Sequence, residues 1–273
     1  MIKIQKDTSK IPNSLQLPFS EFFPNGIPSP PQTTHERRFK LIKEKRYIDE
    51  QVFNDRYKQS DTKKALREIY KNKCAFCEQI IEQSHVEHYR PKSIYYWLAY
   101  SWDNLLLACS YCNTYKDVNF HLLGAKLSFE NKPENLKKIH FSSGENDVLE
   151  KPKMVNPEIT NPIGKIKFQR NGKIESEDER FAYTIEKCKI DRNYLNDERR
   201  KIVDIFQRDI KSSIIENFAL ENQKTAVETI VRKFVNDSKD KDLPFLGFRR
   251  YAISNFLKDL VIEVKDQNPK PVP

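Results

Sequence analysis

The chain has 273 residues, which is enough for one large domain or two small ones with a buried core. Hydrophobic residues make up 38% and charged residues 32%, a composition typical of a globular protein and not of a disordered tail. No apolar run approaches the roughly 20 residues that span a bilayer, and the N-terminus shows no signal-peptide pattern. We therefore expect a cytoplasmic protein that does not contact a membrane.

The formal net charge is +9, and the sequence pI is about 9.1. A basic balance favours polyanionic partners without identifying one. Five cysteines stand at positions 74, 77, 109, 112 and 188. In a cytoplasmic chain, closely spaced cysteine pairs hold metal more often than they form disulfides. Cys188 is far from the two pairs, and we interpret it as a small buried thiol on a helix.

Residues 1–34 form a proline-rich N-terminal arm, with prolines at 12, 18, 24, 28, 30 and 31. Proline fixes φ and removes a backbone donor, so the arm is expected to be extended. Phe19, Phe22 and Phe23 interrupt it with large apolar groups. These must dock, either on the arm's own domain or on a partner.

Residues 35–73 form a helical lead-in, because apolar residues recur there at spacings of three and four. Ser60 and Asp61 are candidate N-caps for a helix from Thr62 to Tyr70. The basic side chains of this region either contact phosphates or make up a solvated helix face. They are Arg37, Arg38, Lys40, Lys43, Lys45 and Arg46.

Residues 74–130 carry the chemistry, beginning with two Cys-x-x-Cys pairs about thirty residues apart. They are Cys74 with Cys77, and Cys109 with Cys112. Each turn directs two thiolates at one ion, and two turns complete a tetrahedron around Zn²⁺. One pair would suit a redox dithiol equally well, but two pairs in this register favour a structural zinc.

Residues 131–273 are predicted as a loop, a hairpin and a helical region. The polar stretch 131–146 is interpreted as loop, and residues 166–174 alternate and contain Asn171-Gly172, a hairpin signal. From about residue 178 to 264 the apolar spacing is again helical. Its apolar positions are interpreted as core-facing stripes, among them Ile202, Ile205, Phe206, Ile215, Leu220, Val227, Phe234, Phe248, Leu260 and Ile262.

Between the cysteine pairs lie residue types suited to hydrolysing a phosphodiester. His88 has the side chain for deprotonating water near neutral pH. Glu87 and Asn113 offer hard oxygen ligands for a cation that neutralises charge on the scissile phosphate. Lys116, one helical turn beyond Cys112, is a candidate for steadying that phosphate, and Asp117 is a possible further ligand. The surrounding Trp97, Trp102, Tyr95, Tyr96 and Tyr100 are interpreted as local core.

The order Cys-x-x-Cys, acid-His-x-x-Pro, Asn-Leu-x-x-x-Cys-x-x-Cys-Asn-x-x-Lys resembles the HNH endonucleases, which have a ββα-metal fold. This resemblance gives Glu87 the place of the acidic metal ligand and His88 that of the general base. Asn104 takes the central Asn, which fixes the loop. Asn113 takes the last position, where His is commoner, and this departure suits Mg²⁺ or Mn²⁺ better than soft transition metals.

Residues 45–210 resemble a narrower family, the PtuB nucleases of Septu-type and some retron-type bacterial anti-phage systems. The likeness is carried by Cys74-Ala75-Phe76-Cys77-Glu78, Glu87-His88-Tyr89-Arg90-Pro91-Lys92-Ser93, Trp102-Asp103-Asn104 and Val155-Asn156-Pro157. The resemblance implies an ATPase partner of the ABC/SMC-like PtuA type, which composition and spacing do not indicate.

The sequence thus predicts a mainly α (α+β) protein, a helical chain carrying a zinc-stapled ββα-metal nuclease core. The predicted activity is hydrolysis of DNA with one divalent cation, Mg²⁺ or Mn²⁺. Two alternatives remain: a zinc-stabilised module that binds nucleic acid or a partner without cutting, and a redox protein using its dithiols.

Overall fold

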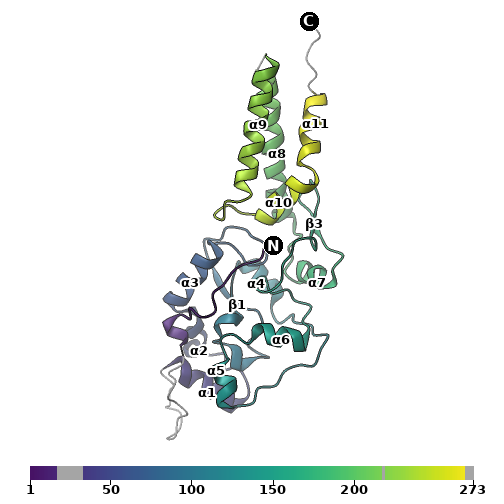
Figure 1. Ribbon diagram of the computed structural model, residues 1–273. Helices are drawn as coiled ribbons and strands as arrows, with labels where there is room; N and C mark the ends of the chain where they lie inside the picture. The colour runs from purple at the N-terminus through teal and green to yellow at the C-terminus, as the bar shows by residue number, and fades with distance from the viewer. Residues whose placement is uncertain (17–32, 217–218, 268–273) are drawn as a thin grey trace.

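The computed structural model describes residues 1–16, 33–216 and 219–267 (Figure 1). Most of these residues lie in helices, and two sheets have two strands each, which confirms the mainly helical α+β class. Phe19, Phe22 and Phe23 of the N-terminal arm lie outside the described residues. No helix in the described ranges is both long and apolar enough to cross a membrane.

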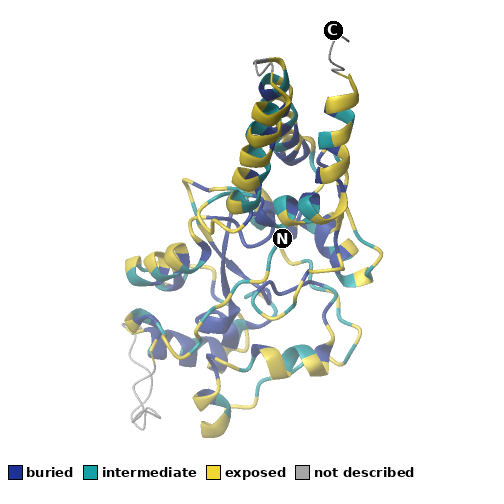
Figure 2. Cartoon of the chain, turned by 45° about the horizontal axis from the view of Figure 1, so that its top comes forward, coloured by how far each residue is buried: buried dark blue, intermediate teal, exposed yellow. Residues whose placement is uncertain are grey.

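A ββα unit occupies the centre of the chain. Strand β1 (His85–His88) pairs antiparallel with β2 (Leu105–Ala108), with Glu87 opposite Leu106. Helix α4 (Ser110–Lys116) follows β2 after one residue and packs on β1. Every residue of β2 is fully buried, so this strand forms the middle of the core (Figure 2).

The aromatic residues between the strands are core, as predicted. Trp97, Trp102, Tyr95 and Tyr100 are all buried, and Tyr96 is half-buried. They surround the loop that joins β1 to β2, so that loop is held by packing on its own side chains.

The lead-in region forms helices α1 (Thr34–Glu44), α2 (Gln51–Asn54) and α3 (Ser60–Tyr70). Helix α3 begins two residues earlier than predicted, and no side chain caps it. The Asp61 carboxylate instead accepts a hydrogen bond from the Ser14 amide, at 2.8 Å. Asp61, which was predicted to cap the helix, therefore holds the N-terminal segment against α3.

Two of the basic residues assigned to a helix face are inside the protein. Arg37 and Arg38 are 8% and 0% exposed. The Arg38 Nη2 donates to the Tyr100 carbonyl at 2.9 Å, and the Arg37 Nε donates to the Val52 carbonyl at 2.7 Å. Both predicted roles, phosphate contact and solvated face, are wrong for these two side chains, because their guanidinium groups satisfy buried carbonyls.

The described part of the N-terminal arm, residues 1–16, lies on the body of the same chain. The Ile4 amide donates to the Pro157 carbonyl at 2.8 Å. The Lys6 ammonium donates to the carbonyls of Trp102 and Leu105, both at 2.7 Å, and lies 4.0 Å from the centre of the Trp102 indole. The segment therefore fixes the turn that leads into β2.

The polar stretch 131–146 is not a simple loop, and this prediction was wrong. It contains α5 (Pro133–Lys137) and the start of α6 (Ser143–Glu150). The buried Arg90 holds α6, since its guanidinium reaches Asp147 at 2.7 Å, Glu150 at 2.8 Å and the Ser143 hydroxyl at 3.0 Å. A tertiary ion cluster therefore stabilises a helix that shows no apolar periodicity.

The predicted hairpin is present, because β3 (Lys167–Phe168) pairs antiparallel with β4 (Ile174–Glu175) around Asn171 and Gly172. Helix α7 (Glu179–Lys187) follows. The long helices α8 (Asn193–Glu216) and α9 (Leu220–Asp237) then run side by side away from the ββα unit. Helices α10 (Leu246–Asn255) and α11 (Leu257–Gln267) complete the described chain.

The C-terminal helices are attached to the first cysteine turn. The Glu78 carboxylate accepts a hydrogen bond from the Gly247 amide of α10 at 3.0 Å, and the Lys73 ammonium donates to the Leu243 carbonyl at 2.8 Å. Some of the apolar positions expected to face the core do not. Ile205, Ile215 and Leu220 of the α8–α9 pair and Ile262 of α11 are 46–70% exposed, so these helices are not covered on all sides.

Replacing Arg90 by methionine should lower the free energy of unfolding by about 3–5 kcal/mol, because the change leaves buried carboxylates without their cation. Arg170→Met is the matched control. Arg170 pairs with Glu263 at 2.7 Å, but both side chains are at least 40% exposed, so its loss should cost no more than about 1 kcal/mol. Urea unfolding of the two variants measures both values, and equal losses would contradict a clamp at Arg90.

Candidate functional site

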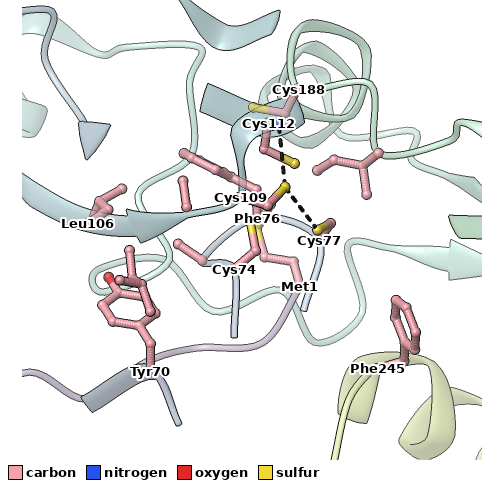
Figure 3. Close-up of a cluster of buried hydrophobic side chains, with 14 of the residues drawn as sticks. Met1, Tyr70, Cys74, Phe76, Cys77, Leu106, Cys109, Cys112, Cys188 and Phe245 are labelled. Carbon is pink, nitrogen blue, oxygen red and sulfur yellow. Dashed lines mark hydrogen bonds between the residues drawn. The ribbon is translucent and has the colours of Figure 1, made fainter. Parts of the chain in front are cut away.

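Four cysteines form one cluster beneath the ββα unit. The Sγ atoms of Cys74, Cys77, Cys109 and Cys112 all lie within 4.8 Å of one another, and Cys77 and Cys109 are 3.9 Å apart (Figure 3). Zn–S bonds of about 2.3 Å place sulfurs about 3.8 Å apart in a tetrahedron. The cluster is therefore compatible with a zinc site. Cys188 is buried but is not one of the four.

The cluster joins the strands to the helix of the unit. Ala75, inside the first cysteine turn, donates its amide to the Leu107 carbonyl of β2 at 2.8 Å. Cys109 is the N-cap of α4, and its Sγ accepts from the Cys112 amide at 3.4 Å. An ion bound here would fix the end of β2 and the start of α4 at once.

Arg192, just before α8, is a cationic partner of this cluster. Its Nη1 lies 3.7 Å from the Cys112 Sγ and its Nη2 lies 3.9 Å from the Cys109 Sγ. Burial lowers the pKa of the Arg192 guanidinium, but the sulfurs of Cys112 and Cys77 outweigh this and raise it. A Zn(Cys)₄ centre would carry excess negative charge, and this guanidinium would offset it. The sequence did not identify Arg192, because it lies about eighty residues from the nearest cysteine of the cluster.

A cleft of about 560 Å³ beside β1 brings several of the predicted residues together. Glu87, His88 and Asn113 line it, and so does Asp117. The strand supplies the first two side chains and α4 the third, so the cleft lies between hairpin and helix.

His88 stands at the end of β1 with its ring held in one orientation. Its Nε2 is 2.9 Å from the Ala99 carbonyl oxygen. A carbonyl only accepts, so Nε2 carries the proton and Nδ1 keeps its lone pair. The ring of Tyr57 packs edge-on against it, with centroids 4.5 Å apart. Burial lowers the pKa of His88 to about 3, which keeps the ring neutral at ordinary pH.

Glu87 is buried beside an ammonium. Its Oε1 accepts from the Lys116 Nζ at 2.6 Å, and the same Nζ donates to the His88 carbonyl at 2.8 Å. Burial raises the pKa of the Glu87 carboxyl, and the Lys116 charge opposes that rise. Because the ammonium holds Oε1, Oε2 is the oxygen with which Glu87 could bind a cation.

Lys116 therefore does not lie where a residue that contacts the substrate phosphate would lie. Its side chain is 0% exposed, so in this structure it cannot meet a substrate. It points inward from α4 and ties the helix to β1 through Glu87 and the His88 main chain. It lies one turn beyond Cys112 as expected, but the sequence does not give the direction in which the side chain points.

Asn104 lies outside the cleft and acts on the loop between the strands. Its Oδ1 accepts from the Arg90 amide at 2.8 Å, and its Nδ2 donates to the carbonyls of Arg90 and Leu98 at 3.1 and 3.2 Å. It touches neither His88 nor Glu87 through these bonds. Asn104 is thus a positioning residue for the segment that follows His88, which agrees with the loop-fixing place that the resemblance gave it.

The cleft also contains residues from the lead-in region that sequence reasoning missed. Tyr57, Lys58 and Lys63 line it beside Lys92. Lys92 lies over the Tyr47 ring at 3.7 Å and donates to Asn54 Oδ1 at 3.1 Å. No local pattern marks Tyr57 or Lys58, because only the packing of this region against β1 brings them to His88.

The region of the cysteine cluster and the cleft is similar to a known family. The family model described as HNH endonuclease matches residues 73–118, which include both cysteine pairs, β1, β2 and α4. Residues 73–118 are therefore similar to an HNH endonuclease domain. The match ends two residues after α4, so the helices on either side of the ββα unit lie outside it.

Two curated relatives carry the name Septu protein PtuB. One, from Bacillus mycoides (strain KBAB4), is 30% identical over 164 residues, covering 54% of this chain and 52% of the relative. The other, from Bacillus thuringiensis, is 43% identical over 61 residues, covering 21% of this chain and 24% of the relative. The chain thus spans about half the length of the first relative and about a quarter of the second.

Replacing Cys109 by serine should remove one sulfur from the cluster, lower the bound zinc and reduce the melting temperature. A structural zinc contributes about 10–16 kcal/mol of apparent folding free energy in small zinc peptides, so the variant should be strongly destabilised. Cys188→Ser is the control, since it changes a buried thiol outside the cluster. Elemental analysis should find one zinc per chain in the control. Full zinc in Cys109→Ser would contradict the assignment.

Replacing Arg192 by glutamine should weaken zinc binding by about 10–100-fold, the range found when partners of metal ligands are removed. Competition with a chromogenic chelator measures the affinity. At saturating zinc the stoichiometry should still be one per chain, because the four sulfurs are intact. An affinity equal to that of the unaltered protein would show that the guanidinium does not contribute to the site.

Proposed function

We propose that this chain is a metal-dependent endonuclease that hydrolyses DNA phosphodiester bonds in the cleft of its HNH domain. The observation that carries the proposal is His88, which is oriented through Nε2 and lines a cleft that Glu87 and Asn113 also line. The family of residues 73–118 and the relatives support the same conclusion.

His88 is the proposed general base. Its Nε2 proton is committed to the Ala99 carbonyl, which leaves the Nδ1 lone pair to accept a proton from water. Burial keeps the ring unprotonated at neutral pH, so that lone pair is free, although the same burial makes the ring a weaker base than an exposed imidazole. The Tyr57 ring against one edge of the imidazole limits its rotation, so the lone pair keeps a fixed direction.

Glu87 and Asn113 are the proposed holders of the catalytic cation, which we propose to be Mg²⁺ or Mn²⁺. Among the described residues, the cysteines form the one cluster of three or more His, Cys, Asp or Glu ligands. The cleft instead offers the carboxylates of Glu87 and Asp117 and the amide oxygen of Asn113. This donor set fits Mg²⁺, which commonly binds through one or two carboxylates, water and substrate phosphate. When bound, the cation supplies charge neutralisation at the scissile phosphate and the departing oxygen.

Lys116 has a positioning role in this proposal. By holding Oε1 of Glu87, it fixes the carboxylate and leaves Oε2 as the oxygen for the cation. It also joins α4, which carries Asn113, to the main chain of His88. The buried ammonium of Lys116 thus fixes Glu87, His88 and Asn113 relative to one another.

We further propose that the chain is the nuclease component of a Septu-type anti-phage system. The two relatives named Septu protein PtuB support this assignment. The same resemblance supports an ATPase partner of the PtuA type, which would hold the nuclease inactive or release it.

Replacing His88 by alanine should lower the rate of cutting supercoiled plasmid by about 10²–10⁴-fold, the usual contribution of a positioned base. The variant should stay folded because it keeps all four cysteine ligands, although it loses one hydrogen bond and the packing of a buried ring against Tyr57. The exposed His121 is the matched control, and His121→Ala should cut as the unaltered protein does. Assays contain Mg²⁺ or Mn²⁺, with EDTA as the metal-free control and the zinc content checked in each sample.

Cutting by His88→Ala at the unaltered rate would contradict the role of the base. Cutting by the unaltered protein that appears only when the ATPase subunit is added would support a nuclease gated by its partner. Absence of cutting under both conditions would favour a zinc-stabilised binding module. EDTA inhibition counts as loss of the catalytic cation only where one zinc per chain is retained.

A further inference from the structure

The outward side of α3 and the turn before it carry a run of cations. Helix α3 buries Thr62, Leu66 and Tyr70 against the core. The opposite side is exposed and basic, and with the neighbouring turns it makes up what we call the α3 face: Lys58, Lys63, Lys64, Arg67 and Lys71. None of these residues belongs to the ββα unit.

The α3 face is continuous with the catalytic cleft. Lys58 and Lys63 line the cleft that holds His88. A second surface cavity, also of about 560 Å³, is lined by four cations and two carboxylates: Lys63, Lys64, Arg67 and Lys71 with Glu68 and Asp242. Lys63 borders both cavities, so positive charge extends from the reacting groups to the far end of α3.

The lysines of this face are not neutralised by ion pairs. Within the described residues, no carboxylate lies within 4.0 Å of the ammonium groups of Lys58, Lys63, Lys64 and Lys71. Exposed lysines elsewhere do pair, as Lys132 does with Glu130 and Lys165 with Asp178. Glu68 and Asp242 border the same cavity without pairing with these lysines, so the clustered ammonium groups repel one another, and a polyanion bound across them relieves that repulsion.

Arg67 fixes the position of this face relative to the catalytic strand. Its Nε donates to the Ser84 hydroxyl at 3.2 Å and its Nη2 donates to the Glu82 carbonyl at 3.0 Å. Ser84 directly precedes β1, which carries Glu87 and His88. Arg67 therefore holds α3 in place beside the catalytic strand, as a surface that guides a substrate requires.

We propose that the α3 face binds the sugar-phosphate backbone of DNA on one side of the scissile bond. The inference rests on the proposed nuclease function and adds the path of the substrate outside the cleft. Helix α3 has 11 residues and is therefore about 16 Å long, the axial length of about five nucleotides of B-DNA. Ammonium groups contact phosphates without reading bases, so binding here is independent of sequence.

The test is a DNA-binding measurement in a His88→Ala background, so that the substrate is not consumed. Lys63, Lys64 and Lys71 are changed together to glutamine, while Arg67 is kept because it supports the strand. The matched control changes Lys224, Lys233 and Lys239 to glutamine. These lysines are also exposed, and they lie on or just after α9. Fluorescence anisotropy with a labelled duplex and a labelled single strand of the same sequence gives Kd at several salt concentrations.

The α3 variant should raise Kd at least about tenfold in 0.1 M salt. It should also make the dependence of log K on log salt shallower, by about 0.9 for each duplex phosphate that the variant no longer neutralises. The control should stay within about twofold, and both triple variants should melt as the parent does. The arm with the larger change, duplex or single strand, identifies the form of DNA that lies on this face.

An α3 variant that binds DNA like the control would overturn the proposal, and so would a parent protein without measurable DNA affinity. Neither result depends on cutting. If DNA binding depends on the α3 face but the protein with His88 intact never cuts, the proposed nuclease function fails while this inference stands. If the unaltered protein cuts and the α3 variant binds DNA normally, the proposed nuclease function stands and this inference fails.

Discussion

The position of the candidate site depends on the convergence of four buried sulfurs. Cys74 and Cys77 lie in a turn attached to β2, and Cys109 and Cys112 lie at the junction of β2 and α4. The strand and helix that carry the site therefore meet at one point, where a single ion would join them. The hydrophobic contacts of so short a hairpin would not suffice, since a two-stranded sheet is at best marginally stable by itself in water.

Around this point the chain adds supports from distant parts of the sequence. Arg192 reaches the sulfurs from the start of α8, and Lys6 reaches the carbonyls at the beginning of β2 from the N-terminal arm. Arg90 ties the loop after His88 to α6, while Asn104 holds the main chain of the same loop. The residues that support the reacting groups are thus spread over almost two hundred positions of the sequence, from Lys6 to Arg192.

How much of this the sequence could predict depends on the range of each interaction. The cysteine spacing predicted the cluster, because two close pairs constrain geometry locally, and the apolar periodicity predicted the helical class. Helix α6 was missed because its stabilising partner, Arg90, lies more than fifty residues away. The inward direction of Lys116 and the burial of Arg38 were missed because a helical spacing gives a face, and the packing of neighbours decides what covers it.

All five cysteines of the chain are buried, including Cys188, which lies outside the cluster. A thiol reagent added to the folded protein should therefore find no accessible sulfur, and any labelling would report local opening around the cluster. The same shielding makes the chain a convenient background for spectroscopy. A single cysteine introduced on its surface would be the one reactive thiol, so a fluorophore or spin label could be attached there without first removing native cysteines.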